Sequence, residues 1–549
     1  MFHFLNRKFQ MHPQRSFCSV KRRFLLCVLI LAPLRSTAAH RYDVVVYGGT
    51  AGGVVTAVSA AREGMSVALL EPGNHLGGMV SGGLGSTDYG KKDVIGGISR
   101  EFFRRVGRVY HQDIAWYFEP HVAEMVFREM AREAKVDVFF AHRLKEGQGV
   151  TKHGTDIVEI HSEDGTAFCA KIFVDCSYEG DLMAQSGVTY TIGREGRAHY
   201  RESLAGVRPK DDGHSFEIPI SARGEDGSLL PEISARPRGA IGSADHKVQA
   251  YNFRMCLSKD KTNQIPFSKP AGYDPQRYRL LALWLQGLAK SAGHGPSLNE
   301  IMIVSPMPNQ KTDVNNRGAF STDYIGKNWD YPDASYQRRA EIWQEHVLYL
   351  RGYFYFLAND PSVPADTQKA FNEYALARDE FPDTDHWPHQ LYVREARRMV
   401  GDFVMTQKDI QEELLKSDVI GMGSYNSDSH NVQRYVESDG TVQNEGNMEV
   451  PVKPYQIPYR IMLPKKQEVT NLLVPVCFSA SHVAFSTGRM EPQYMILGEA
   501  AGVAAKMAIA SGKSVQDMDG SRLRPKLLQR RVVLDLQSTA SDQRRARKN

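Results

Sequence analysis

The chain has 549 residues, with 68 Lys or Arg, 63 Asp or Glu and a formal charge of +5. Seven of the basic residues and none of the acidic ones lie within residues 1–40, so the charge falls to −2 without that segment. This balance excludes nucleic acid and an anionic membrane as expected partners. The remaining length, about 510 residues, exceeds the ~250–300 residues at which a single core stops growing, so we expect two or more lobes.

Residues 1–40 have the pattern of a secretory signal peptide. A basic cluster, Lys21-Arg22-Arg23, precedes an apolar run at 24–34 and the small residues 36–39. The run is about half of the ~20 residues that span a bilayer, so no stable membrane span is expected. The pattern predicts a secreted or periplasmic protein. Sec and twin-arginine export fit it equally, and a mitochondrial transit peptide fits less well because the apolar run is uninterrupted.

Residues 42–71 predict a strand–helix–strand unit that binds a dinucleotide. An apolar strand at 42–47 leads into the turn Gly48, Gly49, Thr50, Ala51, Gly52 and Gly53, then a helix at 54–63 and a second strand at 66–70. The free N–H groups and dipole of such a helix suit a pyrophosphate, and Glu71 is placed to accept hydrogen bonds from a ribose. An acid there disfavours NADP. Thr50 replaces a fingerprint glycine, so its side chain must turn aside or offer its hydroxyl. The alternative is a turn that merely packs the helix against the strand.

A glycine-rich loop follows at residues 75–85, with five glycines in nine positions. Such a segment forms neither helix nor stable strand, and it suits a loop pressed against a flat ligand. We expect Gly77, Gly78, Met79, Gly82 and Gly83 to contact the cofactor. Flavoproteins of the two-dinucleotide-fold kind carry a loop here and NAD-only proteins do not, so the loop indicates FAD.

The rest of the chain predicts a closing β-meander, a second lobe and a return to the cofactor. Strands at 136–140, 157–160 and 170–175 lead to Asp175, Gly180 and Asp181, which we expect near the cofactor. Helical patterns at 275–289, 334–358 and 367–378 alternate with polar loops and suggest a substrate or cap lobe. A strand at 471–476, a small-residue loop at 477–489 and a helix at 493–511 follow. We expect Glu491 and Gly498 to place that helix at the flavin.

These motifs resemble those of the secreted bacterial FAD-dependent oxidoreductases labelled xanthan-lyase-related. The similarity covers roughly residues 42–512, and its most specific stretches are 47–50, 178–184, 190–195, 421–426, 458–460, 479–485 and 489–492. Members usually have Thr-Pro-Ala-Gly where this chain has Thr-Ala-Gly-Gly at 50–53. The resemblance implies FAD and a redox reaction, and it implies no substrate.

The expected fold is α/β, with a Rossmann-type FAD-binding domain and β-meander plus an α+β substrate lobe. Its predicted divisions are a signal peptide at 1–40, the FAD-binding domain at 41–190 and 451–520, the substrate lobe at 191–450 and a tail at 521–549.

Four residues are candidates for catalysis. His482 and Arg489 precede the expected flavin-facing helix, and Tyr425 and His430 lie in a polar loop with Asp428. Imidazole suits proton transfer near neutral pH. A packed histidine, an Arg489 salt bridge to a residue such as Glu491, and a hydrogen-bonded turn are the structural alternatives.

No metal site is expected. The residue types of metal ligands occur together at Asp383, Asp385, His386 and His389. Trp387 and Pro388 interrupt this group, and no helix places its side chains on one face. Cys169, Cys176, Cys256 and Cys477 permit one or two disulfides, which the sequence does not assign.

The leading hypothesis is an exported dehydrogenase or oxidase that transfers hydride to flavin N5 from a small or sugar-like hydroxylated substrate. It would use an unidentified electron acceptor. The alternatives are a polysaccharide-processing lyase or hydrolase that uses FAD structurally, and a non-catalytic flavin-binding protein.

Overall fold

A seven-stranded sheet forms the base of the cofactor lobe, in the order β3-β2-β1-β6-β5-β4 with β20 beside β6. The structure is a computed structural model that describes residues 39–210, 213–412 and 414–536. The strands are β1 (His40–Tyr47), β2 (Val67–Glu71), β3 (Asp137–Phe140), β4 (Val150–His153), β5 (Asp156–His161), β6 (Ala167–Asp175) and β20 (Leu472–Leu473). β1, β2, β3, β6 and β20 pair with one another in parallel. On its other side β6 pairs antiparallel with β5, and β5 pairs antiparallel with β4, which completes a meander. The expected fold class is confirmed.

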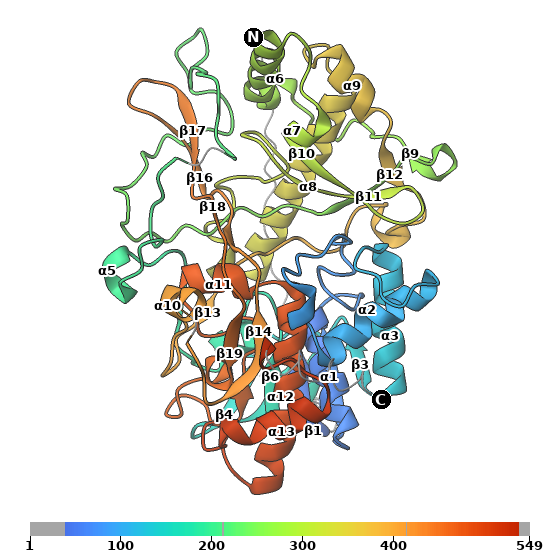
Figure 1. Cartoon of the computed structure of the whole chain (residues 1–549), viewed down its shortest axis with the longest axis vertical. Coiled ribbons are helices and arrows are strands. Elements are labelled where there is room, and N and C mark those ends of the chain that lie inside the picture. Colours follow the sequence, from blue (N-terminus) through green and yellow to red (C-terminus); the bar gives the residue numbers. More distant parts are fainter. Residues whose placement is uncertain (1–38, 211–212, 413, 537–549) are drawn as a thin grey trace, which may run out of the picture. The chain divides into compact units, whose positions relative to one another are not determined.

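Burial on both faces explains why the central strands are continuous apolar runs. Val44, Val45 and Val46 have no exposed surface, and β1 pairs with β2 in the register Val44 with Val67 to Tyr47 with Leu70. Helices α1 (Ala51–Arg62), α2 (Gly97–Val109), α3 (Pro120–Glu133) and α12 (Glu491–Ser511) pack around the same unit. Helix α12 lies along α1 and runs parallel to it (Figure 1). The N-termini of both helices therefore face the carboxyl edge of the parallel strands.

A five-stranded antiparallel sheet forms the base of the substrate lobe, in the order β10-β11-β8-β12-β9. Its strands are β8 (Met255–Ser258), β9 (Gln264–Ile265), β10 (Met302–Pro306), β11 (Lys311–Asn316) and β12 (Ala375–Ala377). The longer helices of this lobe are α6 (Arg279–Ala292), α8 (Tyr336–Asn359) and α9 (Ala365–Phe371). The helix predicted at 367–378 was partly wrong, because residues 375–377 pair with β8 and β9 instead.

Short elements connect the two lobes. The strand pairs are β7 (Tyr190–Thr191) with β13 (Arg398–Met399), β14 (Val419–Gly423) with β19 (Tyr455–Pro458), β15 (Ser427–Ser429) with β18 (Met448–Val450), and β16 (Gln433–Val436) with β17 (Val442–Glu445). The remaining α-helices of the described residues are α4 (Asp181–Gln185), α5 (Arg197–Tyr200), α7 (Leu298–Ile301), α10 (Gln407–Gln411), α11 (His482–Gly488) and α13 (Leu523–Gln529). Helix α11 replaces part of the loop predicted at 477–489. The Ser481 hydroxyl caps it by accepting a hydrogen bond from the Ala484 N–H.

Residues from Ala39 onward form one compact unit that contains both lobes. The predicted signal peptide lies almost wholly in residues 1–38, outside the described residues, as does the tail beyond residue 536. Within the described ranges, no helix has the length and apolarity needed to cross a bilayer. Cys169, Cys176, Cys256 and Cys477 are all free thiols, so none of the permitted disulfides joins them.

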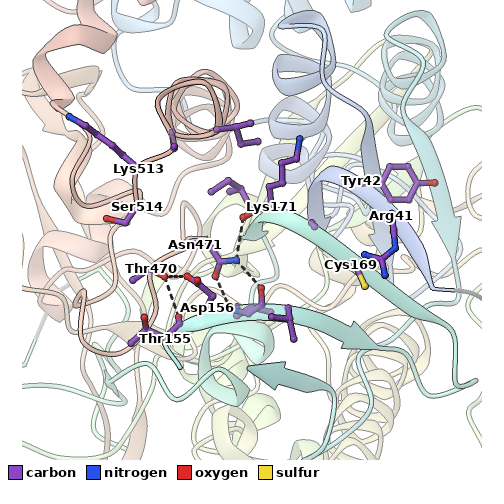
Figure 2. Close-up of a pocket in the computed structure, with 17 residues that line it drawn as sticks. Arg41, Tyr42, Thr155, Asp156, Cys169, Lys171, Thr470, Asn471, Lys513 and Ser514 are labelled. Carbon is purple, nitrogen blue, oxygen red and sulfur yellow. Dashed lines mark hydrogen bonds between the residues drawn. The ribbon is translucent and has the colours of Figure 1, made fainter. Parts of the chain in front are cut away.

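The sheet divides where β5 leaves β6, and the Asn471 side chain bridges the gap (Figure 2). Its Oδ1 accepts from the Ile157 N–H at 2.8 Å, and its Nδ2 donates to the carbonyls of Ile157 at 2.8 Å and Lys171 at 3.2 Å. The adjoining cavity of about 820 Å³ lies where β1 and β6 begin and α12 ends. That edge is opposite the N-termini of α1 and α12, so we assign the Asn471 region to stability.

Replacing Asn471 by alanine is expected to lower the free energy of unfolding by about 2–4 kcal/mol, because buried backbone groups lose their partners. Denaturant titration followed by tryptophan fluorescence measures the change. Thr470→Val is the matched control, since the Thr470 hydroxyl bonds at a more exposed position to Thr155 and Asp156. We expect it to cost less than about 1 kcal/mol. Equal losses in the two variants would contradict the bridging role.

Candidate functional site

The turn between β1 and α1 is tight enough to require glycine at two positions. Gly48 has φ +98°, and a Cβ there would lie 2.7 Å from the backbone N of Ser177. A Cβ on Gly53 would lie 1.9 Å from the Gly48 carbonyl oxygen. The first N–H groups of a helix have no intrahelical partner, so those of Ala51 and Gly52 remain available at the carboxyl edge. This turn is suited to a diphosphate.

Thr50 uses its hydroxyl for hydrogen bonds within the protein. Its hydroxyl donates to the Cys176 carbonyl at 2.8 Å and accepts from the Gly53 N–H at 3.1 Å, which caps α1. Of the two arrangements that the sequence allowed, the structure therefore has the first. The threonine stabilises the helix end and holds β1 to β6 without occupying the space above the turn.

Glu71 ends β2 beside the same turn. Its carboxylate accepts hydrogen bonds from the N–H groups of Gly49 at 2.7 Å and Gly73 at 2.6 Å. Burial raises the pKa of Glu71 to about 7, although these two N–H groups oppose the rise. The carboxyl group thus organises the turn and also lines the cavity described next, where a ribose would meet it.

A cavity of about 360 Å³ lies at this edge, between the cofactor lobe and the substrate lobe. The cofactor lobe lines it with Tyr47, Gly48, Thr50, Glu71, Pro72, Gly73, Arg143, Ser177, Tyr178, Glu179 and Asp181. The substrate lobe lines it with Tyr331, Tyr336, Arg339, Ala340, Trp343, His389 and Gln390. No local motif marks the residues of the second group, so the sequence does not assign them to the cofactor.

Among the residues that the substrate lobe contributes to this cavity, His389 gives the clearest indication of a ligand. Both ring nitrogens are buried and have no hydrogen-bond partner among the described residues. Burial, with the nearby His75 ring, lowers the pKa of His389 to about 3. An unpartnered buried polar group costs about 1–3 kcal/mol, so a neutral imidazole beside this cavity suits a ligand that supplies the missing partner.

The glycine-rich loop runs from the turn to the substrate lobe. Gly77 donates its N–H to the Gly49 carbonyl at 2.7 Å, and Gly78 lies against the Tyr178 ring. Further along, a Cβ on Gly82 would meet Gln390, and one on Gly83 would lie 1.9 Å from the Arg254 carbonyl oxygen. The loop was predicted to press against a ligand. At Gly82 and Gly83 the close contact is instead with the substrate lobe.

Asp175, Gly180 and Asp181, at the end of β6 and just after it, lie among contacts made within the protein. Asp175 accepts hydrogen bonds from the N–H groups of Ser177 and Met183 and from the Ser177 hydroxyl. Gly180 has φ +67° and precedes α4. Asp181 lies 2.8 Å from both Arg339 and Arg397 of the substrate lobe. Burial opposes ionisation, but these two cations hold the pKa of Asp181 below its ordinary value.

Glu491 opens α12 next to the glycine-rich loop. The Tyr178 hydroxyl donates to Glu491 Oε1 at 2.7 Å and accepts from the Met79 N–H at 2.9 Å. Glu491 Oε2 and both amide atoms of Gln493 are buried without partners among the described residues. These orphaned atoms, together with the open N-terminus of α1 and the acid at the end of β2, fit FAD. Met79 and Glu491 thus meet at Tyr178, which lines the cavity, and their contact with the cofactor stays a prediction.

Gly498 packs against α1. It is seven residues into α12, where a Cβ would lie 2.4 Å from the Gly52 carbonyl oxygen. The residue is a contact point between α12 and the turn at the start of α1. Its smallness still matters for the site, because it lets the two helix N-termini lie side by side.

Three of the four catalytic candidates share one buried polar cluster. Arg489 Nη2 donates to the Asp428 carbonyl at 2.9 Å and lies 3.3 Å from its carboxylate. His430 Nδ1 lies 2.7 Å from Asp323 Oδ2, and its Nε2 is 3.7 Å from Asp428 Oδ1. Near them, the Tyr425 hydroxyl donates to Asp88 at 2.9 Å, and Arg489 also donates to Tyr392 at 3.1 Å. The Arg489 ion pair is thus with Asp428 and not with Glu491.

His482 lies in a neighbouring network that Gln249 joins to the His430 backbone. Its Nδ1 lies 2.9 Å from Glu395 Oε2 and its backbone N–H donates to Glu195, while Arg398 pairs with both of these acids. Burial and the Arg398 charge lower the pKa of His482 to about 3. The sequence suggested His482 because it precedes the flavin-facing helix. Helix α11 intervenes, so proximity in sequence does not bring this ring to Arg489 and His430.

Among the described residues, two groups of side chains have ligand atoms within 4.8 Å of one another, but neither is arranged to hold a metal ion. His75 and His389 stack with parallel rings at 3.9 Å near Glu124, so their ring planes do not meet at one point. In the group of Glu119, His121 and Glu380, the Lys311 ammonium lies 2.7 Å from both acids and supplies the positive charge. Of the ligand-type residues noted at 383–389, Asp385 forms an ion pair with Arg351, and His386 contacts the Glu380 carbonyl.

Comparison with known proteins identifies a family over most of the chain. The model of a family described as FAD dependent oxidoreductase matches residues 43–527. No curated protein sequence matches. Similar solved structures include the flavin-dependent brominase Bmp2, at 16% identity and TM-score 0.21 over 32% of this chain and 50% of that one.

Two more solved structures show similarity of the same order. L-proline dehydrogenase from P. horikoshii has 14% identity and TM-score 0.23 over 29% of this chain and 59% of that one. AlpK has 14% identity and TM-score 0.25 over 59% of this chain and 51% of that one. The chain thus spans roughly half the length of these structures, a similarity too distant to inform an activity.

Proposed function

This chain belongs to the FAD-dependent oxidoreductase family, and on that premise we propose that it oxidises a small or sugar-like hydroxylated substrate. The observation that supports the proposal is the buried pair of His430 and Asp323 beside Arg489. Oxidation of an alcohol removes a hydride from carbon and a proton from oxygen and leaves a carbonyl group. FAD, when bound, would supply the hydride acceptor, so the protein must supply a group that takes the proton.

His430 has the properties of that base. Asp323 accepts the hydrogen bond from Nδ1–H, which leaves Nε2 to receive a proton. Burial and the Arg394 charge lower the pKa of His430, so the ring is neutral near pH 7 and ready to accept. Asp323 then stabilises the imidazolium that forms. The residue pair therefore suits removal of the hydroxyl proton as the carbonyl develops.

The charge balance of the cluster favours an uncharged substrate. Each buried guanidinium already has a carboxylate partner: Arg489 with Asp428, Arg394 with Asp323, and Arg254 with Asp313. An added anion would find no free cation among these pairs. One nitrogen each of Arg254 and Arg489, two nitrogens of Arg394, and the hydroxyls of Ser427 and Ser429 remain without hydrogen-bond partners among the described residues. Several hydroxyl oxygens on a neutral ligand would match these donors.

A dye-linked reduction screen tests the proposal. Neutral sugars and polyols, sugar acids and amino acids are each mixed with the FAD-loaded enzyme and an artificial acceptor. We expect a neutral hydroxylated compound to reduce the dye, and peroxide formation without dye would distinguish an oxidase from a dehydrogenase. Glycan cleavage without any acceptor, or reduction by amino acids alone, would refute the proposal.

We further propose that the enzyme works outside the cytoplasm, in the periplasm or the medium. The support is the order of basic, apolar and small residues in 1–40. N-terminal sequencing of protein recovered from each compartment should find an exported form that begins near residue 40. Recovery of only the full-length chain in the cytoplasm would contradict export.

A further inference from the structure

Glu491 is a buried carboxyl group at the first position of a 21-residue helix. Only 3% of the residue is exposed. Oε1 accepts a hydrogen bond from the Tyr178 hydroxyl at 2.7 Å, and Oε2 has no partner among the described residues. Tyr178 lines the cofactor cavity, so Glu491 lies one hydrogen bond away from it.

The groups around Glu491 do not supply a positive charge. Tyr178 and Tyr494 are the titratable groups that face it, and Arg489, which precedes the helix, points to Asp428. From the neighbouring helices, α1 brings Gly52 against α12, and α2 brings the Ser99 hydroxyl to the Pro492 carbonyl. Burial accordingly raises the pKa of Glu491 to about 8. The side chain therefore keeps its proton at pH 7.

A protonated acid at this position has a use that an ionised one lacks. The N-terminus of a helix stabilises negative charge, so a ligand that gathers negative charge is favoured there. A carboxylate would compete with such a ligand and repel it. A carboxylic acid instead offers an O–H donor. The Met79–Tyr178–Glu491 chain of hydrogen bonds fixes Oε1 to the tyrosine, which leaves Oε2 as the free donor.

We propose that Glu491 is a positioning residue that remains protonated and donates a hydrogen bond from Oε2 to the pyrimidine edge of FAD. The flavin oxygens and nitrogens at that edge are acceptors, and the α12 N-terminus favours charge that builds there on reduction. Loss of the Glu491 proton replaces a donor by a buried negative charge. FAD affinity therefore depends on the protonation of this side chain. The inference is independent of the substrate and of the role of His430.

The dissociation constant of FAD, measured by quenching of its fluorescence on titration into the apoprotein, provides the test. Binding favours the protonated form, so affinity is constant below the pKa of the free site and falls above it. For the wild-type protein we expect the dissociation constant to rise about tenfold between pH 7 and pH 9. In Glu491→Gln the amide keeps a donor and an acceptor without titrating. We expect that variant to bind within about threefold of wild type at pH 7, with no such rise.

Two further variants separate this role from general effects of burial. Glu491→Leu removes the donor and should weaken FAD binding at least tenfold at pH 7. Glu499→Gln removes another buried acid, whose pKa burial raises to about 7, two turns along the same helix. It should keep the wild-type pH dependence. The proposal is overturned if Glu491→Gln titrates like wild type, if Glu491→Leu retains full affinity, or if Glu499→Gln abolishes the dependence.

Discussion

Replacing His430 by alanine is expected to lower the rate of substrate-dependent FAD reduction by about 10²- to 10⁴-fold, because positioned general bases contribute rate factors of that size. FAD content should stay near that of the wild type, since the His430–Asp323 pair lies in the substrate lobe cluster and not in the turn that follows β1. Stopped-flow absorbance of the flavin during anaerobic mixing with the substrate found by the screen measures the rate.

The pH profile of the same reaction provides a second readout. The base must be neutral, so the rate should fall as the pH drops through the pKa of His430. Because burial and Arg394 lower that pKa, the acid limb should lie below the ordinary imidazole value of about 6.5. His482→Ala is the matched variant, a second buried histidine with a carboxylate partner. If His482 carried the loss and His430→Ala did not, the assignment of the base would be wrong.

Replacing Gly498 by valine is expected to abolish FAD retention and to destabilise the protein by about 3 kcal/mol or more. The new Cβ would lie 2.4 Å from the Gly52 carbonyl oxygen and 2.8 Å from the Thr56 hydroxyl, so α12 must move away from α1. Both helix N-termini at the cofactor edge would shift apart. Flavin absorbance after purification, together with denaturant unfolding, measures the two effects.

Ala510→Val is the control for the Gly498 variant. Ala510 is an exposed residue of the same helix, so a valine there costs only its lower helix propensity, roughly 0.5 kcal/mol. Full retention of FAD by the Gly498 variant would mean that α12 does not set the geometry of the cofactor edge. The assignment of Gly498 to helix contact would then fail.

Local patterns were sufficient for the strand–helix–strand unit and its cofactor. A segment of about 30 residues contains the apolar runs of β1 and β2, the turn at 48–53 and Glu71. Short-range backbone constraints determine each of these features. Sequence reasoning also placed α12 within two residues at its start. It failed where tertiary pairing overrides local propensity. Residues 375–377 form β12 because β8 and β9 lie beside them.

The buried polar cluster around Arg489 and His430 is the part that sequence reasoning resolved least. Tyr425, His430 and Arg489 were named, but their partners Asp88, Asp323 and Tyr392 were not, and His482 was ranked with them. Asp88 lies three residues after the glycine-rich loop, so the end of that loop held a usable signal. No comparable signal marks Asp323, which is 107 residues from His430.

By itself the sequence determined the Rossmann-type unit, the FAD preference and the return of the chain to the cofactor. Hydrophobic periodicity and glycine placement determine backbone structure over a few residues, so they can be recognised along the sequence. Only the tertiary structure decided which histidine meets Asp323, that His389 and α8 line the cofactor cavity, and that Gly498 is a helix contact. Those outcomes depend on how the two lobes pack. Packing brings together side chains that are far apart in sequence, and no local sequence pattern identifies either partner.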